Sequence, residues 1–349
     1  MLISQILSLL ADNISRFCYV LTIFFNSALI FLTVKYTRQI VGTYRNMIVT
    51  FAVFGITFST ADILVRPLFH SHNGCFMYFT LGSAFRFSKK LTGFALLVYA
   101  GVYAVIMTFL TIQFVYRASL LSKSRQKFTK FFDGYKLIIW LVYTLFISII
   151  WGSAISILSS DDVTDAYLRN VVLVNYGVEI SGIPYYPVLA YNGEGSQKTV
   201  RWNSVIFLSI VTIVMIIHYS IMMICGFYMY QRTKMNLKNS SSAYEKLQKQ
   251  FFQALIYQTI APTLVFHFPV FVVLFAPFFD LKFSFNSSFV VYGFSAYPLV
   301  DSLIVLNVVT EYKYAYARFM RQLIKQVIEV MGENTPSEVT RTNAVISQG

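Results

Sequence analysis

Charged side chains inside long apolar segments are the residues of this sequence with the clearest potential for chemistry. Asp62 and Arg66 are four positions apart, so in a helix they lie one turn apart and can form an ion pair. Asp301 occurs in another apolar segment, where a carboxylate needs an interior partner or water. We interpret Asp62 and Arg66 as an intramembrane ion pair, with a ligand contact as the alternative. For Asp301 we expect a conformational role, although a buried structural carboxylate explains it nearly as well.

Residue patterns typical of enzymes and metal centres are absent from the sequence. No Walker loop, HExxH or GxSxG motif occurs. The histidines and cysteines are dispersed and lack the spacing of metal ligands: His70, His72, His218, His267, Cys18, Cys75 and Cys225. We therefore predict a protein that is not an enzyme and that holds no metal and no cofactor.

The composition indicates that lipid surrounds most of the chain. Of 349 residues, 56% are hydrophobic and only 12% are charged, and the mean hydropathy is +0.61. A soluble domain carries about 25% charged residues because its surface requires them. The net charge of +13 does not indicate a nucleic-acid partner, because no basic helix or stacking platform accompanies it. Basic loops that face anionic lipid head groups explain the charge better.

Seven apolar segments reach the length of about 20 residues that a helix needs to cross a bilayer. They lie near Phe17–Val34, Asn46–Val65, Leu91–Val115, Leu137–Leu158, Val205–Tyr230, Phe251–Phe278 and Phe289–Val309. The apolar run Cys75–Phe85 is too short to span and is interpreted as part of an extracellular loop. The longest loop, Ser159–Trp202, is expected to cap the outer mouth of the bundle. We predict an all-α, seven-transmembrane helix bundle.

Most of the 28 lysines and arginines lie in the loops after spans one, three and five and in the tail. The positive-inside rule then places the N-terminus outside the cell. The sequons at Asn13 and Asn286 fall on the outer side and are predicted glycosylation sites. The expected organisation is an extracellular N-terminus (1–16), the bundle (17–309), an amphipathic helix on the inner membrane surface (310–331) and a disordered cytoplasmic tail (332–349).

Helix bends and apolar spacing suggest where a ligand binds. Pro262, Pro269 and Pro298 each remove a backbone hydrogen bond and are expected to bend spans six and seven. The residues predicted to line an apolar cavity in the outer half are Phe94, Val98, Val105, His267, Phe271, Phe275 and Tyr292. For each of them, core packing remains the alternative interpretation.

A series of short motifs runs along the chain from position 42 to position 313. The motifs are Gly42-Thr43-Tyr44-Arg45, Arg66-Pro67 with His70, Gln113-Phe114-Val115-Tyr116-Arg117, Leu247 to Thr263, Ala276 to Asp280, Tyr297-Pro298 with Asp301, and Glu311-Tyr312-Lys313. In this order they resemble the nematode serpentine chemoreceptors of the Str class, the family that includes the diacetyl odorant receptor. The block in span six is the most specific of them.

The resemblance implies a G-protein-coupled receptor for a small, often volatile molecule, in the plasma membrane of the sensory cilium of a chemosensory neuron. The implied partners are an odorant-like ligand, a heterotrimeric G protein, membrane lipids and, as an open case, a second receptor in a dimer. Arg117 looks analogous to the arginine of the rhodopsin-like DRY motif, although no acidic residue precedes it, and Tyr297-Pro298 looks like a variant of NPxxY. The residues expected to act in activation and coupling are Arg117, Tyr116, Lys246, Lys249, Pro298 and Asp301.

Two other classes of membrane protein remain open. An odorant-gated ion channel of the insect type also has seven spans but the opposite orientation, against which the loop charge argues. A small-solute transporter would have internal repeats and paired charges near mid-bilayer. The sequence has no such repeat, and its two halves differ in charge pattern.

Overall fold

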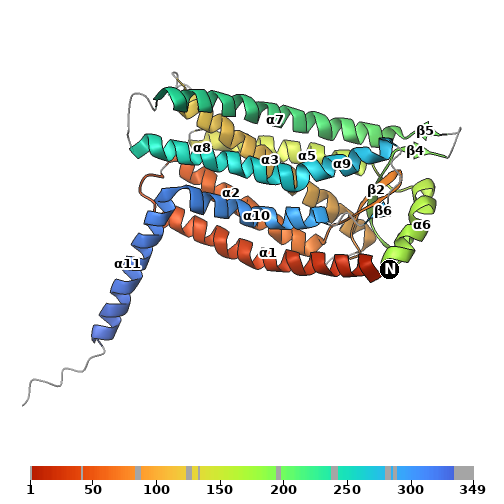
Figure 1. Cartoon of the computed structure of the whole chain (residues 1–349), viewed down its shortest axis with the longest axis horizontal. Coiled ribbons are helices and arrows are strands. Elements are labelled where there is room, and N and C mark those ends of the chain that lie inside the picture. Colours follow the sequence, from red (N-terminus) through yellow and green to blue (C-terminus); the bar gives the residue numbers. More distant parts are fainter. Residues whose placement is uncertain are drawn as a thin grey trace, which may run out of the picture.

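The computed structural model describes residues 2–40, 42–82, 88–122, 128–132, 134–193, 198–236, 243–279, 284–285 and 289–333. This part of the chain contains seven helical spans that are long and apolar enough to cross a membrane, which confirms the predicted bundle. They are α1 (Leu2–Lys35), α2 (Thr43–Val65), α3 (Lys89–Leu120), α5 (Leu137–Ser156), α7 (Trp202–Asn236), the consecutive α8 (Ala243–Pro262) and α9 (Phe268–Phe275), and α10 (Phe289–Val308). All of them follow the long axis of the molecule (Figure 1).

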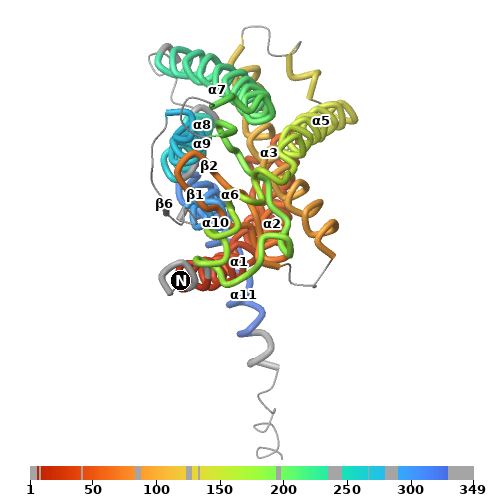
Figure 2. The backbone as a smooth tube through the Cα atoms, turned by 90° about the vertical axis from the view of Figure 1, so that its right-hand side faces the viewer, coloured from red at the N-terminus to blue at the C-terminus, as the bar shows by residue number. Residues whose placement is uncertain are grey.

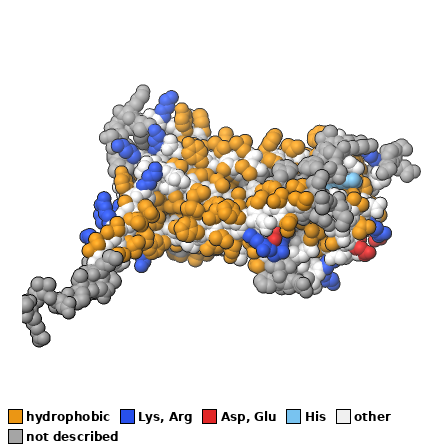
Figure 3. All heavy atoms as spheres, turned by 60° about the horizontal axis from the view of Figure 1, so that its bottom comes forward, with side chains coloured by type: hydrophobic (Ala, Val, Ile, Leu, Met, Phe, Trp, Pro, Cys, Tyr) orange, Lys and Arg blue, Asp and Glu red, His pale blue; other side chains and the backbone are white. Residues whose placement is uncertain are grey.

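The outer surface of the bundle is apolar, as a lipid-facing surface must be. Ile149 on α5 is 66% exposed, and Met223 and Ile224 on α7 are 71% and 69% exposed. Figure 3 shows apolar side chains over the middle of the visible face, with lysines and arginines gathered towards the end from which α11 leaves. Such a continuous exposed apolar belt indicates contact with acyl chains rather than water.

Helix α3 lies in the interior and contacts α2, α5, α7 and α8. Figure 2 shows it between α2, α5 and α7. A glycine permits the close approach of α5: a Cβ atom at Gly101 would lie 2.7 Å from Ser148 Oγ and 3.3 Å from the Ser148 carbonyl oxygen. Small residues let helix backbones pack closely in this way within membranes.

One end of the bundle is covered by an antiparallel sheet, where the sequence analysis expected a loop. Its strand order is β3-β2-β1-β6. The strands are β1 (Leu68–His72), β2 (Cys75–Phe79), β3 (Tyr185–Leu189) and β6 (Ser284–Phe285). Strands β1 and β2 pair with Leu68 opposite Phe79, and β2 pairs with β3 with Cys75 opposite Leu189. Asn73, in the turn between β1 and β2, adopts the left-handed conformation (φ 47°) that asparagine tolerates.

Strand β2 is buried on both faces because the sheet lies between the bundle and α6 (Asp162–Tyr176). Side chains alternate along a strand, so Phe76 and Tyr78 join the core of the bundle. Cys75, Met77 and Phe79 point the other way and pack with Leu168 and Val172 of α6. We call the sheet and α6 together the lid. The expectation that the loop 159–202 caps one end of the bundle agrees with this placement.

Local sequence signals explain where the lid elements begin and end. Helix α2 ends at Arg66, which adopts the left-handed conformation (φ 52°) directly before Pro67. Proline disfavours a helical conformation in the residue before it, so the chain turns here into β1. Asp161 caps α6 in a reciprocal capping box with Thr164, and Gly177 ends the helix at φ 71°.

Helix α11 (Thr310–Glu333) turns away from the bundle axis at the end opposite the lid (Figure 1). It occupies the segment where the amphipathic helix was expected. Helix α1 is already helical from Leu2, inside the expected N-terminal segment 1–16. The expected tail lies, from residue 334 on, outside the described residues. The remaining short elements are η1 (Gly134–Lys136), η2 (Ile180–Gly182), β4 (Tyr191–Asn192), β5 (Thr199–Val200), η4 (Thr263–His267) and η5 (Ala276–Phe279).

Candidate functional site

A cavity of about 350 Å³ lies beneath the lid, between the lid end of the bundle and the sheet. Its wall is almost entirely apolar and aromatic. The lid contributes Phe69, Phe76, Tyr78, Tyr186 and Val188, and the helices contribute, among others, Tyr99, Tyr103, Trp151, Met215, Tyr219, His267, Phe271, Phe275 and Phe294. Pockets for small molecules are typically of this size and lining, with few polar groups that fix orientation.

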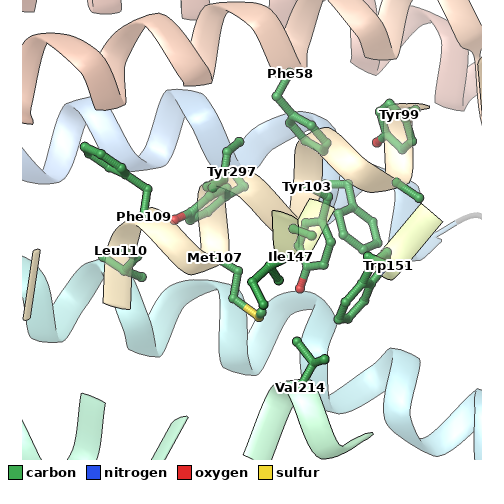
Figure 4. Close-up of a cluster of buried hydrophobic side chains, with 14 of the residues drawn as sticks. Phe58, Tyr99, Tyr103, Met107, Phe109, Leu110, Ile147, Trp151, Val214 and Tyr297 are labelled. Atoms are coloured by element: carbon green, nitrogen blue, oxygen red, sulfur yellow. The ribbon is translucent and has the colours of Figure 1, made fainter. Parts of the chain in front are cut away.

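Helical spacing and aromatic packing shape the wall of this cavity. Leu208, Val211, Thr212, Met215 and Tyr219 of α7 recur three and four residues apart, so one face of α7 lines the cavity. On α3 and α5, Tyr103 and Trp151 lie side by side (Figure 4), with ring centroids 5.7 Å apart in an edge-to-face arrangement. The ring of Phe294 on α10 packs against Tyr103 in the same way, at 5.2 Å.

The main polar feature of the cavity is a hydrogen-bonded group centred on His267. Its Nε2 contacts the hydroxyl of Tyr103 on α3, and its Nδ1 lies 2.5 Å from the hydroxyl of Tyr219 on α7. Tyr219 also lies 2.7 Å from Thr263 Oγ1. A neutral imidazole has one donor and one acceptor nitrogen, so two hydroxyls satisfy it completely. His267 therefore connects span six to α3 and α7 at the floor of the cavity.

The position of His267 depends on an irregular turn in span six. After Pro262 the chain forms the π-helical turn η4 (Thr263–His267), and α9 begins at Phe268. Proline supplies no backbone N–H, and π turns inside α-helices occur frequently at functional sites. Pro269 lies in the first turn of α9, directly after this π-helical turn. The π-helical turn that follows Pro262, where a bend is expected, thus lies next to residues that line the cavity.

Asp62 has different partners from those predicted. Tyr99 donates to its Oδ1 at 3.0 Å, Ser295 donates to its Oδ2 at 2.6 Å, and Ser15 also donates to Oδ2. The expected Asp62–Arg66 pair is wrong, because the left-handed conformation of Arg66 breaks the helical geometry on which it depended. Arg66 Nε lies instead 3.4 Å from Asp12 of α1. Asp62 therefore joins α1, α2, α3 and α10 through hydroxyl groups.

Arg117, near the α11 end of α3, is buried between aromatic rings. Its guanidinium carbon lies 3.3 Å from the ring centroid of Tyr44 on α2 and 4.2 Å from that of Phe251 on α8. Its Nη1 donates to Gln248 Oε1 at 2.5 Å. We call Arg117, Tyr44, Phe251 and Gln248 the arginine clamp. It connects α3 to α2 and to span six at the end of the bundle opposite the cavity.

The other residues expected to act in activation surround the clamp. Tyr116 is buried and its ring stacks with Tyr44, at 6.3 Å between centroids. Asp301 hydrogen-bonds Gln258 and lines, with Tyr44 and Phe251, a small cavity of about 10 Å³. The Pro298 carbonyl accepts a hydrogen bond of 3.2 Å from Asn26 of α1. Lys246 and Lys249 are exposed on α8, on either side of Leu247 and Gln248.

The structure brings together only part of the predicted cavity lining. His267, Phe271 and Phe275 line the cavity. Phe94 and Val98 are 61% and 47% exposed on the outer surface of α3, so their prediction as ligand contacts is wrong.

The remaining predicted residues lie outside the cavity. Val105 is buried elsewhere on α3, and Tyr292 donates to the Leu7 carbonyl of α1 at 3.1 Å. Asn13 is exposed on α1, and Asn286 lies outside the described residues. Within the described part of the chain, no three histidine, cysteine or acidic side chains are grouped as they would be around a metal ion.

Several cavity residues were not predicted, above all Tyr103, Trp151 and Tyr219. Helix α3 is apolar on every side, so its periodicity does not identify the face that meets the cavity. The aromatic residues of the lid had a usable signal: Asn73-Gly74 comes directly before the apolar run Cys75–Phe79, and that dipeptide is typical of a β-hairpin.

Comparison with known proteins gives consistent matches over most of the chain. The sequence model of the family described as serpentine type 7TM GPCR chemoreceptor Str matches residues 11–317. The G-protein coupled receptor str-33 of Caenorhabditis elegans is 34% identical over 309 residues, which cover 88% of this chain and 89% of that protein. Serpentine receptor class r-10 of Caenorhabditis briggsae is 26% identical over 313 residues, which cover 89% and 90%. Squid rhodopsin aligns over 92% of this chain and 87% of its own, at 11% identity and a TM-score of 0.49.

Proposed function

Because the chain belongs to the Str family of serpentine seven-transmembrane GPCR chemoreceptors, we propose that it detects a small, mainly apolar molecule in the cavity beneath the lid and signals to a heterotrimeric G protein. The protein is a multi-pass membrane receptor and not an enzyme. The observation that carries the proposal is the cavity itself: about 350 Å³, walled by aromatic rings, with the hydrogen-bonded group around His267 as its main polar feature. An odorant-like ligand of few heavy atoms suits this volume and lining.

The path from the ligand to the G protein runs along span six. A ligand that contacts His267, Phe271 or Phe275 acts on the segment directly after the π-helical turn. If it binds better when α8 has moved away from α3, it shifts the equilibrium towards that arrangement. Movement of α8 separates Phe251 and Gln248 from Arg117 and opens the arginine clamp. Arg117, with Lys246 and Lys249, then offers a basic surface to the G-protein α subunit.

The proposed orientation places the lid and the N-terminus outside the cell and α11 inside. Its support is the distribution of lysines and arginines, which are most frequent in the loops after spans one, three and five and after α10. The proposed location is the plasma membrane of the sensory cilium of a chemosensory neuron, in keeping with a chemoreceptor family.

Expression in a heterologous cell with a calcium reporter and a panel of small volatile molecules tests the proposal. We expect at least one apolar member to give a response that inhibition of G proteins abolishes. Phe271→Ala should weaken that response about threefold to tenfold, since this lining ring is 53% exposed and contributes roughly half of the 1.5–3 kcal/mol of a fully buried side chain. Phe94→Ala is the matched control, because this ring faces lipid. Arg117→Ala should abolish the response while the receptor stays at the cell surface.

Four results would contradict parts of the proposal. Equal effects of Phe271→Ala and Phe94→Ala would show that the ligand binds elsewhere. A full response of the surface-expressed Arg117→Ala receptor would remove the role of the clamp in coupling. An ionic current that persists without G proteins would identify an odorant-gated channel, and uptake of the active compound would identify a transporter.

A further inference from the structure

A second cavity, of about 580 Å³, lies at the α11 end of the molecule, where α11 leaves the end of α1 (Figure 1). Its lining differs sharply from that of the ligand cavity. It consists of Lys35, Tyr36, Arg38, Arg318, Arg321 and Gln322. Four cationic side chains therefore meet around one hollow, and we call this hollow the basic cavity.

Arg318, on one side of the basic cavity, is held in place by hydrogen bonds and an ion pair. Its Nε and Nη2 donate to the Tyr36 carbonyl oxygen at 2.8 and 2.6 Å. Its Nη2 also lies 2.7 Å from Glu311 Oε1, and this glutamate is only 4% exposed. The same carboxylate oxygen accepts the backbone N–H of Arg38 at 2.8 Å. These contacts fasten α11 to the chain that follows α1 and neutralise the charge of Arg318.

The other three cations have no such neutralisation. Lys35, Arg38 and Arg321 are exposed, and in the part of the chain that the structure describes no carboxylate lies within ion-pair distance of their side chains. Three like charges around one hollow create a local positive potential, which attracts an anion most strongly when it carries several negative charges. The arrangement therefore indicates an anionic ligand with more than one negative charge.

Apolar surfaces next to the basic cavity point to the kind of anion. Phe31 and Val34 are exposed on the last turns of α1. Leu323, Ile324 and Val327, two to six residues beyond Arg321 on α11, are 42–52% exposed. A free phosphate compound has no apolar part that could contact these surfaces, whereas the acyl chains of a phospholipid can pack against them.

We propose that the basic cavity binds the multiply phosphorylated headgroup of a polyphosphoinositide, whose acyl chains lie against α1 and α11. Basic pockets on the cytoplasmic side of membrane proteins recognise such headgroups. The proposal rests on the orientation given above, which places this end of the bundle at the inner leaflet. A bound lipid would hold α11 against the membrane beside the arginine clamp.

Binding of phosphatidylinositol 4,5-bisphosphate to the purified receptor in nanodiscs of phosphatidylcholine tests this inference. The triple variant Lys35→Gln, Arg38→Gln, Arg321→Gln should weaken binding at least about tenfold. The matched control Lys130→Gln, Lys313→Gln, Lys325→Gln removes the same charge from positions outside the basic cavity and should change binding less than about twofold. Both variants must elute as monodisperse receptor, which separates loss of the site from loss of the fold.

Three outcomes would overturn the inference. Equal weakening by the two triple variants would indicate diffuse attraction to negative charge. Equal affinity for phosphatidylserine at matched total charge would remove the headgroup preference. Equally tight binding of soluble inositol trisphosphate would identify a free phosphate ligand instead of a lipid. None of these measurements involves an odorant or a G protein, so failure here is distinguishable from failure of the proposed receptor function.

Discussion

His267 and Arg117 attach span six to α3 at two levels, the first near the middle of α3 and the second near its α11 end. Tyrosine hydroxyls surround the first, and the rings of Tyr44 and Phe251 enclose the second. A cation over an aromatic ring gains about 0.5–2 kcal/mol, and the gain is lost within a few ångströms. A small displacement of span six is therefore sufficient to remove the stabilisation at Arg117.

A single substitution in the arginine clamp should change the basal activity of the receptor. Tyr44→Leu removes the ring nearest the guanidinium and should destabilise the closed arrangement by about 1 kcal/mol, which raises ligand-independent signalling about fivefold. Phe54→Leu is the control, since this ring lies on the same helix and packs on Phe109 rather than on Arg117. Unchanged basal signalling of a surface-expressed Tyr44→Leu receptor would show that the clamp does not hold the inactive state.

His70 gives the lid a pH-dependent stability. It is 2% exposed, its Nδ1 lies 3.0 Å from the Tyr176 hydroxyl, and burial, with His72 nearby, lowers its pKa to about 4. The unfolded chain takes up this proton near pH 6.5, but the folded lid does not. Stability is therefore complete above pH 6.5 and falls as the pH decreases towards 4, by about 2 kcal/mol between pH 7 and pH 5.

Thermal unfolding of the solubilised receptor at pH 7 and pH 5 checks this prediction. The decrease in melting temperature from pH 7 to pH 5 should be larger for the native protein than for His70→Gln, because the variant has no group that titrates at this position. Because burial also lowers the pKa of His72, both proteins retain some pH dependence. Identical losses in the two proteins would mean that His70 titrates normally in the lid.

At the scale of elements, the seven spans could be predicted and the lid could not. A span is defined by length and hydropathy, which a sequence contains directly. The lid depends on pairing between β2 and β3, which lie more than 100 residues apart, and no local pattern specifies that partner. Similarly, the i, i+4 spacing of Asp62 and Arg66 implied a pair, but the turn enforced before Pro67 prevented it.

The contact between α3 and α5 should tolerate no side chain at position 101. Gly101→Ala places a Cβ atom against Ser148 and should lower stability by about 1–3 kcal/mol, because overpacking displaces the backbone. The melting temperature and the fraction of receptor at the cell surface measure this effect. Ser148→Gly in the same chain should restore part of the loss. Gly182→Ala is the control, since nothing lies within 4 Å of a Cβ atom there.

At the scale of the whole molecule, orientation determines which cavity meets the ligand and which meets the cytoplasm. The two cavities lie at opposite ends and differ in character, one aromatic and one basic. Only one orientation gives the basic cavity access to the inner leaflet, where anionic phospholipids are abundant. The receptor and lipid proposals therefore share one topological premise.

Glycosylation tests that premise directly. In cells, endoglycosidase should reduce the apparent mass of the receptor, and the double variant Asn13→Gln, Asn286→Gln should abolish the reduction. The single variants assign the glycan, since Asn13 lies within the apolar part of α1, whereas Asn286 comes directly after β6 in the sequence. A third sequon, Asn239-Ser240-Ser241, lies in the loop after span five. A glycan that survives the double variant but is lost in Asn239→Gln would therefore reverse the orientation.

The lid is closed without a covalent bond. Its strands are joined to one another by backbone hydrogen bonds. The Tyr186 hydroxyl of β3 donates to the Gly93 carbonyl of α3 at 3.0 Å, and Lys89 Nζ of α3 donates at 2.8 Å to the carbonyl of Ser181, which lies in η2 between α6 and β3. All three cysteines are free thiols. Each of these attachments contributes about 1 kcal/mol and can break and form again. Such reversible contacts let the edge of the sheet open and close again, and a reducing agent should leave both steps unaltered.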